Sequence, residues 1–236
     1  MDTIITPTPP LIEARGLRFE VGGGAGRVNI LKGVDLTVRE GEALAVVGPS
    51  GSGKTSLLML LAGLERPTGG TLRVAGRDLA ALDEDALARF RREEVGIVFQ
   101  AFHLVPTMTA LENVAIPLEF SGDPHAFSRA EAALKAVGLG HRLAHYPGQL
   151  SGGEQQRVAV ARAFVALPRL ILADEPTGNL DRATGQAVME LLFDLRARFG
   201  TTLVLITHDP ALAARCARQV HVADGVIERD TALAPA

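Results

Sequence analysis

The 236-residue chain has little of what marks a secreted or membrane-spanning protein. Its one cysteine, Cys216, excludes an internal disulfide and fits a reducing compartment; we expect it to be a packing residue on a helix. The longest apolar stretch, around residues 57–64, is far shorter than the ~20 residues of a membrane span. Residues 1–10 lack the basic start and long apolar centre of a secretory signal, so we expect a loose tail there.

The chain also has no excess of positive charge, since its formal net charge is −3. This argues against a nucleic-acid-binding surface spread over the whole molecule, and we expect no nucleic-acid partner. Only Lys32, Lys54 and Lys135 are lysines, so arginine carries nearly all the positive charge. Lys54 is therefore not a by-product of a lysine-rich surface. The 47% of apolar residues can supply the core of one large domain, or of one domain with an inserted lobe.

Residues 48–55 read Gly-Pro-Ser-Gly-Ser-Gly-Lys-Thr and match the phosphate-loop pattern in full. An apolar, strand-forming run precedes them at 43–47, and a leucine-rich helical segment follows at 56–64. Glycines let successive backbone N–H groups turn toward a phosphate, and the helix adds the positive end of its dipole. The pattern assigns Lys54 to the outer phosphates and the Thr55 hydroxyl to Mg²⁺. An ordinary glycine-rich turn is the much weaker alternative.

Strand-forming and helix-forming segments alternate along most of the chain. The expected strands cover 11–20, 33–38, 43–47, 71–74, 95–99, 170–173 and 202–206. The expected helices cover 56–64, 83–92 and 183–199, and residues 101–167 form helical segments separated by Pro106, Pro117, Pro124 and Pro147. The glycines at 22–26 lack a Lys-Thr pair and a following helix, which favours a hairpin connection. This order predicts an α/β core with an inserted helical lobe.

Two acidic residues follow the apolar run 170–173, where open α/β sheets place their ligands. We expect Asp174 to orient Mg²⁺ and Glu175 to polarise the water that attacks the γ-phosphate. The structural alternative is that these acids cap the next helix. His208, after another buried strand, is expected to bond the γ-phosphate or the attacking water. Gln100 can offer an amide oxygen to Mg²⁺ or water.

Residues 150–157 read Leu-Ser-Gly-Gly-Glu-Gln-Gln-Arg and begin another helix. Ser151 and Glu154 match a capping box, which could explain those two positions by helix capping alone. It does not explain Gly152 and Gly153, since glycine costs roughly 1 kcal/mol in a helix relative to Ala. A helix start with bare glycines and a hydroxyl is a good anion site. Because the phosphate loop already surrounds one face of a nucleotide, we expect this site to serve the nucleotide of another subunit.

Together these segments resemble the ATP-binding subunits of ABC transporters over nearly the whole chain. In that family's terms, 48–55 is Walker A, Gln100 the Q-loop, 150–156 the signature, 170–174 Walker B, 179–181 the D-loop and His208 the switch histidine. The resemblance implies an α/β P-loop NTPase core with an N-terminal antiparallel β subdomain and an inserted α-helical subdomain. We expect one domain over 11–230, its helical part at 101–167, and tails at 1–10 and 231–236.

The resemblance also implies binding of ATP and Mg²⁺. The expected ATP-binding residues are Phe19, Gly48, Pro49, Ser50, Gly51, Ser52, Gly53, Lys54, Thr55, Ser56, Ser151, Gly152, Gly153, Glu154 and Asp181. Thr55, Gln100 and Asp174 are expected at the metal, and Glu175, His208 and Gln100 in catalysis. Phe19 is the nearest candidate for the aromatic residue, commonly Tyr, that stacks on adenine.

Family resemblance implies a head-to-tail homodimer with two ATP molecules at the interface, bound to membrane permease subunits at the cytoplasmic face of the inner membrane. Phe102, Leu104, Val105, Pro106 and Met108 are candidates for the permease contact. Their apolar character would equally suit the core of the helical lobe, and both interpretations stay open.

Residues 102–106, 111–114 and 173–181 resemble those of lipoprotein-releasing and macrolide-export ATPases, in which hydrolysis drives a mechanical stroke. The chain ends soon after Ile227, so we expect no regulatory domain of the kind that many importer ATPases carry. The alternative is a non-transport ABC ATPase that signals to a membrane partner, as in cell division. A soluble P-loop kinase would leave residues 151–156 without a role.

Overall fold

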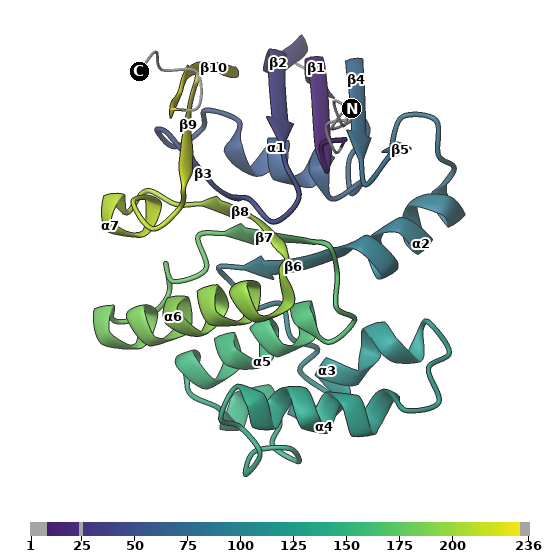
Figure 1. The fold of residues 1–236 in the computed structure, drawn as a ribbon, viewed down its shortest axis with the longest axis vertical. Helices are drawn as coiled ribbons and strands as arrows, with labels where there is room; N and C mark the ends of the chain where they lie inside the picture. Colours follow the sequence, from purple (N-terminus) through teal and green to yellow (C-terminus); the bar gives the residue numbers. More distant parts are fainter. Residues whose placement is uncertain (1–8, 24–25, 232–236) are drawn as a thin grey trace, which may run out of the picture.

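Two β-sheets organise the computed structural model, which describes residues 9–23 and 26–231 (Figure 1). The first sheet is antiparallel, in the order β2-β1-β4-β5, and the second has the order β10-β9-β3-β8-β7-β6. The strands of the first are β1 (Ile12–Gly23), β2 (Gly26–Val38), β4 (Gly69–Val74) and β5 (Arg77–Asp78). Those of the second are β3 (Ala43–Val47), β6 (Val95–Phe99), β7 (Leu170–Asp174), β8 (Thr202–Ile206), β9 (Arg218–Ala223) and β10 (Val226–Asp230).

The second sheet is parallel from β9 to β6, and only the β9–β10 pair is antiparallel. All five residues of β8 are buried, as are the first four of β7. Continuous apolar burial of this kind is typical of parallel strands that are covered on both faces. The carboxyl ends of β3, β7 and β8 therefore lie along one edge of the sheet.

Helices cover both faces of the parallel sheet (Figure 1). α1 lies between the two sheets, whereas α5 and α6 lie on the opposite side of the parallel sheet, with α3 and α4 beyond α5. The helices are α1 (Lys54–Leu61), α2 (Glu84–Glu94), α3 (Ala110–Glu119), α4 (Ala126–Ala136), α5 (Gly152–Phe164), α6 (Arg182–Phe199) and α7 (Pro210–Ala213), with a 3₁₀ turn, η1, at Pro147–Gln149. Within the described ranges, none of them is both long and apolar enough to cross a bilayer.

Side-chain caps set the starts of several helices. Asp83 accepts from Ala86 N at the start of α2, and Asp181 accepts from Thr184 N at the start of α6. Thr109 and Glu112 form a capping box that begins α3. α6 ends at Gly200, whose φ of 66° is left-handed and suits glycine. These short polar residues satisfy backbone N–H groups that the helix itself leaves free.

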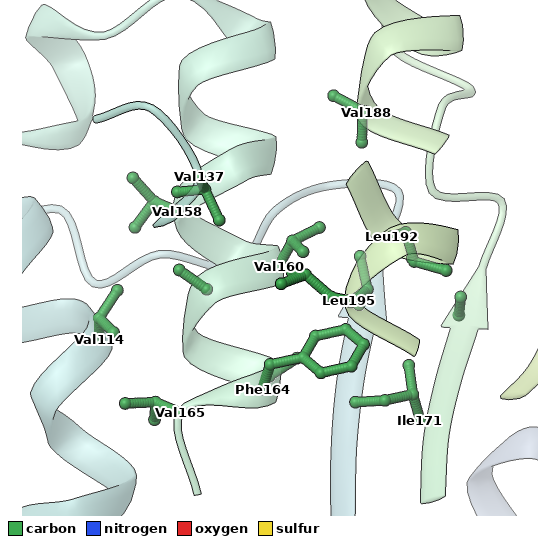
Figure 2. Packing of buried hydrophobic residues seen from close by; sticks show 14 of the residues in the cluster. Val114, Val137, Val158, Val160, Phe164, Val165, Ile171, Val188, Leu192 and Leu195 are labelled. Carbon is green, nitrogen blue, oxygen red and sulfur yellow. The ribbon is translucent and has the colours of Figure 1, made fainter. Parts of the chain in front are cut away.

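Two clusters of buried side chains form the core, one on each side of the parallel sheet. The first joins α3, α4, α5 and α6 to the sheet, and Figure 2 shows Phe164 of α5 packed among Leu195 of α6 and Ile171 of β7. The second joins α1 and α2 to the antiparallel sheet, and Phe90 is its largest fully buried side chain. The helices between β6 and β7 thus share one core with the sheet.

All the strands that the sequence predicts are present, but several local expectations were wrong. Pro117 lies inside α3 instead of ending a helix. It is near the C-terminus of α3, where it removes a single backbone bond, and Val114 and Leu118 on that helix are buried. The helix expected to reach residue 64 ends at Leu61 with Ala62 as its C-cap, because Gly63 follows in the left-handed region with a φ of 64°.

Two further expectations concern single residues. Cys216 is buried, as expected of a packing residue, but it lies in the bend between α7 and β9 and not on a helix. Burial raises the pKa of its thiol to about 11. Gly23 pairs with Gly26 across the antiparallel β1–β2 ladder, in agreement with a hairpin, while residues 24–25 of the glycine cluster lie outside the described ranges.

We predict that Phe164→Ala lowers the free energy of unfolding by about 3–5 kcal/mol, because it leaves a cavity between α5 and the sheet. Phe164 is 4% exposed, whereas Phe120 is 74% exposed. Phe120→Ala is the control, and it should change the free energy by less than about 0.5 kcal/mol. Urea unfolding of both variants checks this, and equal losses would contradict the assignment of Phe164 to the core.

Candidate functional site

The segment Gly48–Thr55 turns the chain from β3 into α1. Gly48, Gly51 and Gly53 have φ values of 146°, 77° and 101°, in the region that side chains disfavour. A Cβ on Gly48 would lie 2.0 Å from Val222 O, and one on Gly53 would lie 2.8 Å from Leu31 Cδ2. Glycine is therefore required at 48 and 53 both by backbone conformation and by close packing.

Lys54 and Thr55 begin α1 and point to different partners. The Lys54 ammonium donates to Gly48 O at 2.9 Å and to Pro49 O at 2.7 Å, which holds it over the loop. The Thr55 hydroxyl donates to Asp174 Oδ2 at 3.0 Å. The structure thus joins the phosphate loop to the end of β7, as expected if both serve one phosphate and its metal.

Asp174 is half-buried at the end of β7. Burial raises the pKa of its carboxyl, and the neighbouring Glu175 acts in the same direction, while the Thr55 hydroxyl and Lys54 oppose the shift. Loss of hydration makes the charged form of the carboxyl less favourable. A cation bound beside Asp174 would offset that cost. The residues that meet here suit Mg²⁺, which commonly takes one or two protein oxygens and completes its shell with water and phosphate.

Glu175 and His208 form a pair beside Asp174. His208 Nδ1 lies 2.9 Å from Glu175 Oε2, and the His208 side chain is 76% exposed against 21% for Glu175. Glu175 has a left-handed φ of 45°, and its N–H donates to Ile206 O at 3.0 Å. This backbone bond ties the residue after β7 to the end of β8. The two side chains assigned to water and the γ-phosphate are therefore neighbours in the fold.

A pocket of about 310 Å³ adjoins the phosphate loop. Its lining residues are Val28, Asn29, Ile30, Gly51, Gly53, Lys54, Thr55, Ser56, Asp224 and Gly225. The β9–β10 turn, with Asp224 and Gly225, forms one wall of this pocket. Two contacts hold the turn there: Gly225 N donates to Ser52 O at 3.1 Å, and Lys32 pairs with Asp224 at 2.6 Å. Sequence reasoning missed this wall, since an Asp-Gly turn signals a hairpin and not its place beside another loop.

Phe19 does not fit the adenine-stacking role expected of it. It pairs in register with Leu31 on the antiparallel sheet, is 8% exposed and belongs to the second core cluster. Strand alternation turns its ring toward the core, so most of its surface is covered by protein. Val28, which is 64% exposed, and Ile30 are the apolar side chains that line the pocket in its place.

Gln100 lies at the end of β6, as expected, but it is bonded to Asn179. Gln100 Nε2 donates to Asn179 Oδ1 at 3.1 Å, and Asn179 Nδ2 donates to Gln100 O at 3.0 Å. Within the described residues, no hydrogen bond joins Gln100 to Thr55 or Asp174. Its role at the metal stays a prediction.

Ser151 and Glu154 form the capping box that their spacing predicts. Glu154 N donates to Ser151 Oγ at 3.3 Å, and Ser151 N donates to Glu154 Oε2 at 2.8 Å. That second bond lowers the pKa of Glu154, with a further contribution from Arg142. Asp181 likewise caps α6, and its bonds to Thr184 lower the pKa of its carboxyl. Helix capping is thus one role of these residues, and it leaves nucleotide contact open.

Gly153 has a packing role that sequence reasoning missed. A Cβ on Gly153 would lie 2.3 Å from Thr184 Cγ2, and one on Gly152 would lie 3.3 Å from Leu180 Cδ2. The start of α5 therefore packs closely on the segment that enters α6, and Gly153 cannot be replaced without a shift. Among the described residues, none of 151–154 lines the pocket beside the phosphate loop.

The residues of the phosphate loop fit a bound triphosphate. The Ser52 hydroxyl is buried and has no hydrogen-bond partner among the described residues. A buried hydroxyl without a partner is unfavourable, and a phosphate oxygen would satisfy it. The Lys54 ammonium and the first N–H groups of α1 add positive charge at the same place.

The fold and the site define a phosphate-loop nucleotide-binding protein. A family model described as ABC transporter matches residues 31–178. The uncharacterised ABC transporter ATP-binding protein YbbA of Escherichia coli is 49% identical over 95% of this chain and 99% of its own length. The lipoprotein-releasing system ATP-binding protein LolD of Geobacter metallireducens is 50% identical over 93% of this chain and 99% of its own. The chain belongs to the ABC transporter family, as one of its ATP-binding, ATP-hydrolysing subunits.

Two further similar proteins are a combined ATP-binding/permease protein and a dimeric cassette. The macrolide export ATP-binding/permease protein MacB of Marinobacter nauticus is 50% identical over 94% of this chain, which corresponds to 35% of MacB. A solved dimeric structure of the ATP-binding cassette MJ0796, in a post-hydrolysis state with ADP and Pi, has a TM-score of 0.87 at 39% identity. It covers 95% of this chain and 100% of its own. The expected ABC ATPase fold is confirmed.

We predict that Asp174→Asn stabilises the protein increasingly as pH rises, in the absence of nucleotide and metal. Because its pKa is raised above the ordinary 3.8, the Asp174 carboxyl favours the folded state in acid, and this contribution is lost as pH rises through the folded pKa. An asparagine carries no charge at either end of the range. Urea unfolding between about pH 4 and pH 7 checks the difference. Asp194→Asn, on the exposed face of α6, is the control. A gain in the free energy of unfolding for Asp174→Asn that is largest in acid would contradict the raised pKa of Asp174.

Proposed function

We propose that this subunit powers a membrane permease of the export or mechanotransmission type, and that it works as a head-to-tail homodimer. In this arrangement the phosphate loop of one protomer and Ser151, Gly152 and Gly153 of the other enclose one ATP. The observation that carries the proposal is that the start of α5 lies outside the pocket that the phosphate loop lines. The solved structure of MJ0796 is dimeric, which supports a dimer for this chain.

Each protomer supplies the remaining groups around its own ATP. The Lys54 ammonium and the backbone of 48–53 bind the phosphates, and the Ser52 hydroxyl donates to one of their oxygens. Thr55, Asp174 and, after a change of partner, Gln100 would hold Mg²⁺, which would supply positive charge to offset that of the phosphates. Glu154 and Asp181 keep the start of α5 and of α6 in place beside the partner's nucleotide.

Hydrolysis depends on the residues after β7 and β8. The Glu175 carboxylate accepts a hydrogen bond from the attacking water and polarises it toward the γ-phosphorus. In its imidazolium form His208 donates from Nδ1 to Glu175 and from Nε2 to an oxygen of the γ-phosphate. Cleavage frees the γ-phosphate as inorganic phosphate. The dimer opens once that phosphate leaves, because it no longer joins the two protomers.

The permease contact is proposed on the loop after β6, at the cytoplasmic face of the inner membrane. Pro106 is exposed, and Phe102, Val105 and Met108 are half-buried, which leaves part of each side chain available. Leu104 packs against the first core cluster, so for this residue the core interpretation fits better. The names of LolD and MacB support lipoprotein or macrolide export as the class of work.

We predict that Glu175→Gln lowers ATP turnover by about 10²–10⁴-fold, because the amide is a poor proton acceptor, while ATP still binds. With saturating ATP this variant should accumulate as a dimer, which light scattering after gel filtration detects, with the permease present if the isolated subunit does not respond. Glu190→Gln, on the exposed face of α6, is the matched control and should keep full activity. A Glu175→Gln variant that binds ATP and yet stays monomeric under both conditions would contradict the divided site.

The partner can be tested separately from the chemistry. Purification of the tagged subunit from its native membranes, in the presence of ATP, is expected to bring down a permease with a large extracytoplasmic part. Reconstitution of that pair should couple ATP hydrolysis to movement of a lipoprotein or an amphiphilic drug. ATPase activity stimulated by the partner without movement of any cargo would favour the signalling alternative.

A further inference from the structure

The start of α5 carries a charge of the wrong sign for a phosphate site. Glu154 is the third residue of α5, and its Oε2 accepts from Ser151 N at 2.8 Å. This bond lowers the pKa of the Glu154 carboxyl, so the side chain is charged at neutral pH. The start of a helix carries roughly +0.5 of an elementary charge. The full negative charge of Glu154 therefore exceeds the positive charge on which the binding of a phosphate would depend.

Arg142 supplies a compensating charge. Its Nε donates to Glu154 Oε1 at 3.0 Å, on the oxygen that does not bind Ser151 N. The side chains of Arg142 and Glu154 are 36% and 15% exposed, so water screens this pair less than it screens a pair on the open surface. In the described part of the chain, Arg142 is the only cationic residue in an ion pair with Glu154. With both side chains counted, the start of α5 is again positive.

A neighbouring histidine and the backbone hold the Arg142 guanidinium in place. Arg142 Nη1 lies 3.0 Å from His145 Nε2, and the ring nitrogen is the acceptor because arginine stays protonated. His145 N donates to Arg142 O at 3.0 Å, which closes a turn between the two residues. His145 O accepts at 2.8 Å from the N–H of Ala110, the first residue of α3. The guanidinium thus comes from a loop that is fixed to α3, and not from α5 itself.

We propose that Arg142 is a positioning residue for the ATP-driven dimer. Its guanidinium offsets the charge of Glu154 and holds that carboxylate on the N–H of Ser151, so that the start of α5 can meet the triphosphate of the other protomer. The inference rests on the proposed divided site, and it assigns Glu154 to the capping box instead of to phosphate contact. Arg142 is not among the residues that line the pocket beside the phosphate loop.

A double-mutant cycle on the trapped dimer tests this role. Arg142→Met and Glu154→Gln are introduced singly and together in the Glu175→Gln background, and sedimentation gives the dissociation constant of the ATP-bound dimer. Methionine removes the charge, whereas glutamine can still accept from Ser151 N in a capping box. With Glu154 present, Arg142→Met should raise the dissociation constant about tenfold, because the carboxylate then repels the phosphate unopposed. With Glu154→Gln, the same change should raise it less than about threefold.

Two further variants separate the charge of Arg142 from its part in fastening the loop. The contact with Glu154 uses a single nitrogen, so Arg142→Lys is expected to restore most of the assembly that Arg142→Met loses, even if the methionine variant folds poorly. Arg169→Met is the matched control, because Arg169 Nε donates to Glu40 Oε1 at 2.9 Å in a pair of the same kind. Arg169 lies just before β7, at the end of that strand opposite Asp174, and its loss should leave the dimer constant unchanged.

The outcomes distinguish this inference from the proposed function. If Arg142→Met has no effect, or weakens the dimer equally with Glu154 and with Gln at position 154, the charge-offset role is refuted and the divided site stands. If Arg142→Lys weakens the dimer as much as Arg142→Met, or if the affinity for ADP measured by calorimetry falls together with dimerisation, the inference is also refuted. If Glu175→Gln by itself remains monomeric with ATP and permease, the proposed function fails first.

Discussion

The parallel pairing of β3 with β8 and of β8 with β7 is the constraint on which the site depends. Ile206 of β8 pairs with Val46 on one side and with Asp174 on the other, so the three strands end in register. The phosphate loop, Glu175 and His208 then begin at one edge of the sheet. The bond between Thr55 and Asp174 and the contact between Glu175 and His208 follow from this register. A shift of one residue in any strand would turn its side chains to the other face and separate them.

Close backbone approach explains positions that chemistry alone leaves open. Gly48 lies against Val222 O, and Gly153 lies against Thr184, each with no room for a methyl group. At Gly153 the same absence of a side chain leaves the first N–H groups of α5 bare, which suits the anion site of the proposed dimer. Packing within one protomer and recognition across two can thus require the same residue.

α5 is bonded to several other segments of the molecule. Its start carries the capping box of Ser151, its middle binds carbonyls at the end of β6 and after β7 through Gln156, and near its end Arg162 donates to two carbonyls of the loop after β6. Asn113, which is fully buried, holds that loop by bonds to both the N–H and the carbonyl of Val105. Buried polar contacts of this kind set geometry, because each would be costly to leave unpaired.

The phosphate loop, the acids after β7 and the capping box at Ser151 were predictable from the sequence, because each is a local pattern whose chemistry depends on neighbouring residues. The same holds for the strands, whose apolar runs carry their own period. Contacts between distant segments were not predictable: the core position of Phe19, the pairing of Gln100 with Asn179, the pocket wall at Asp224 and the helical setting of Pro117. In these cases the outcome depends on which segment of the chain lies opposite, and only the packed tertiary structure decides that.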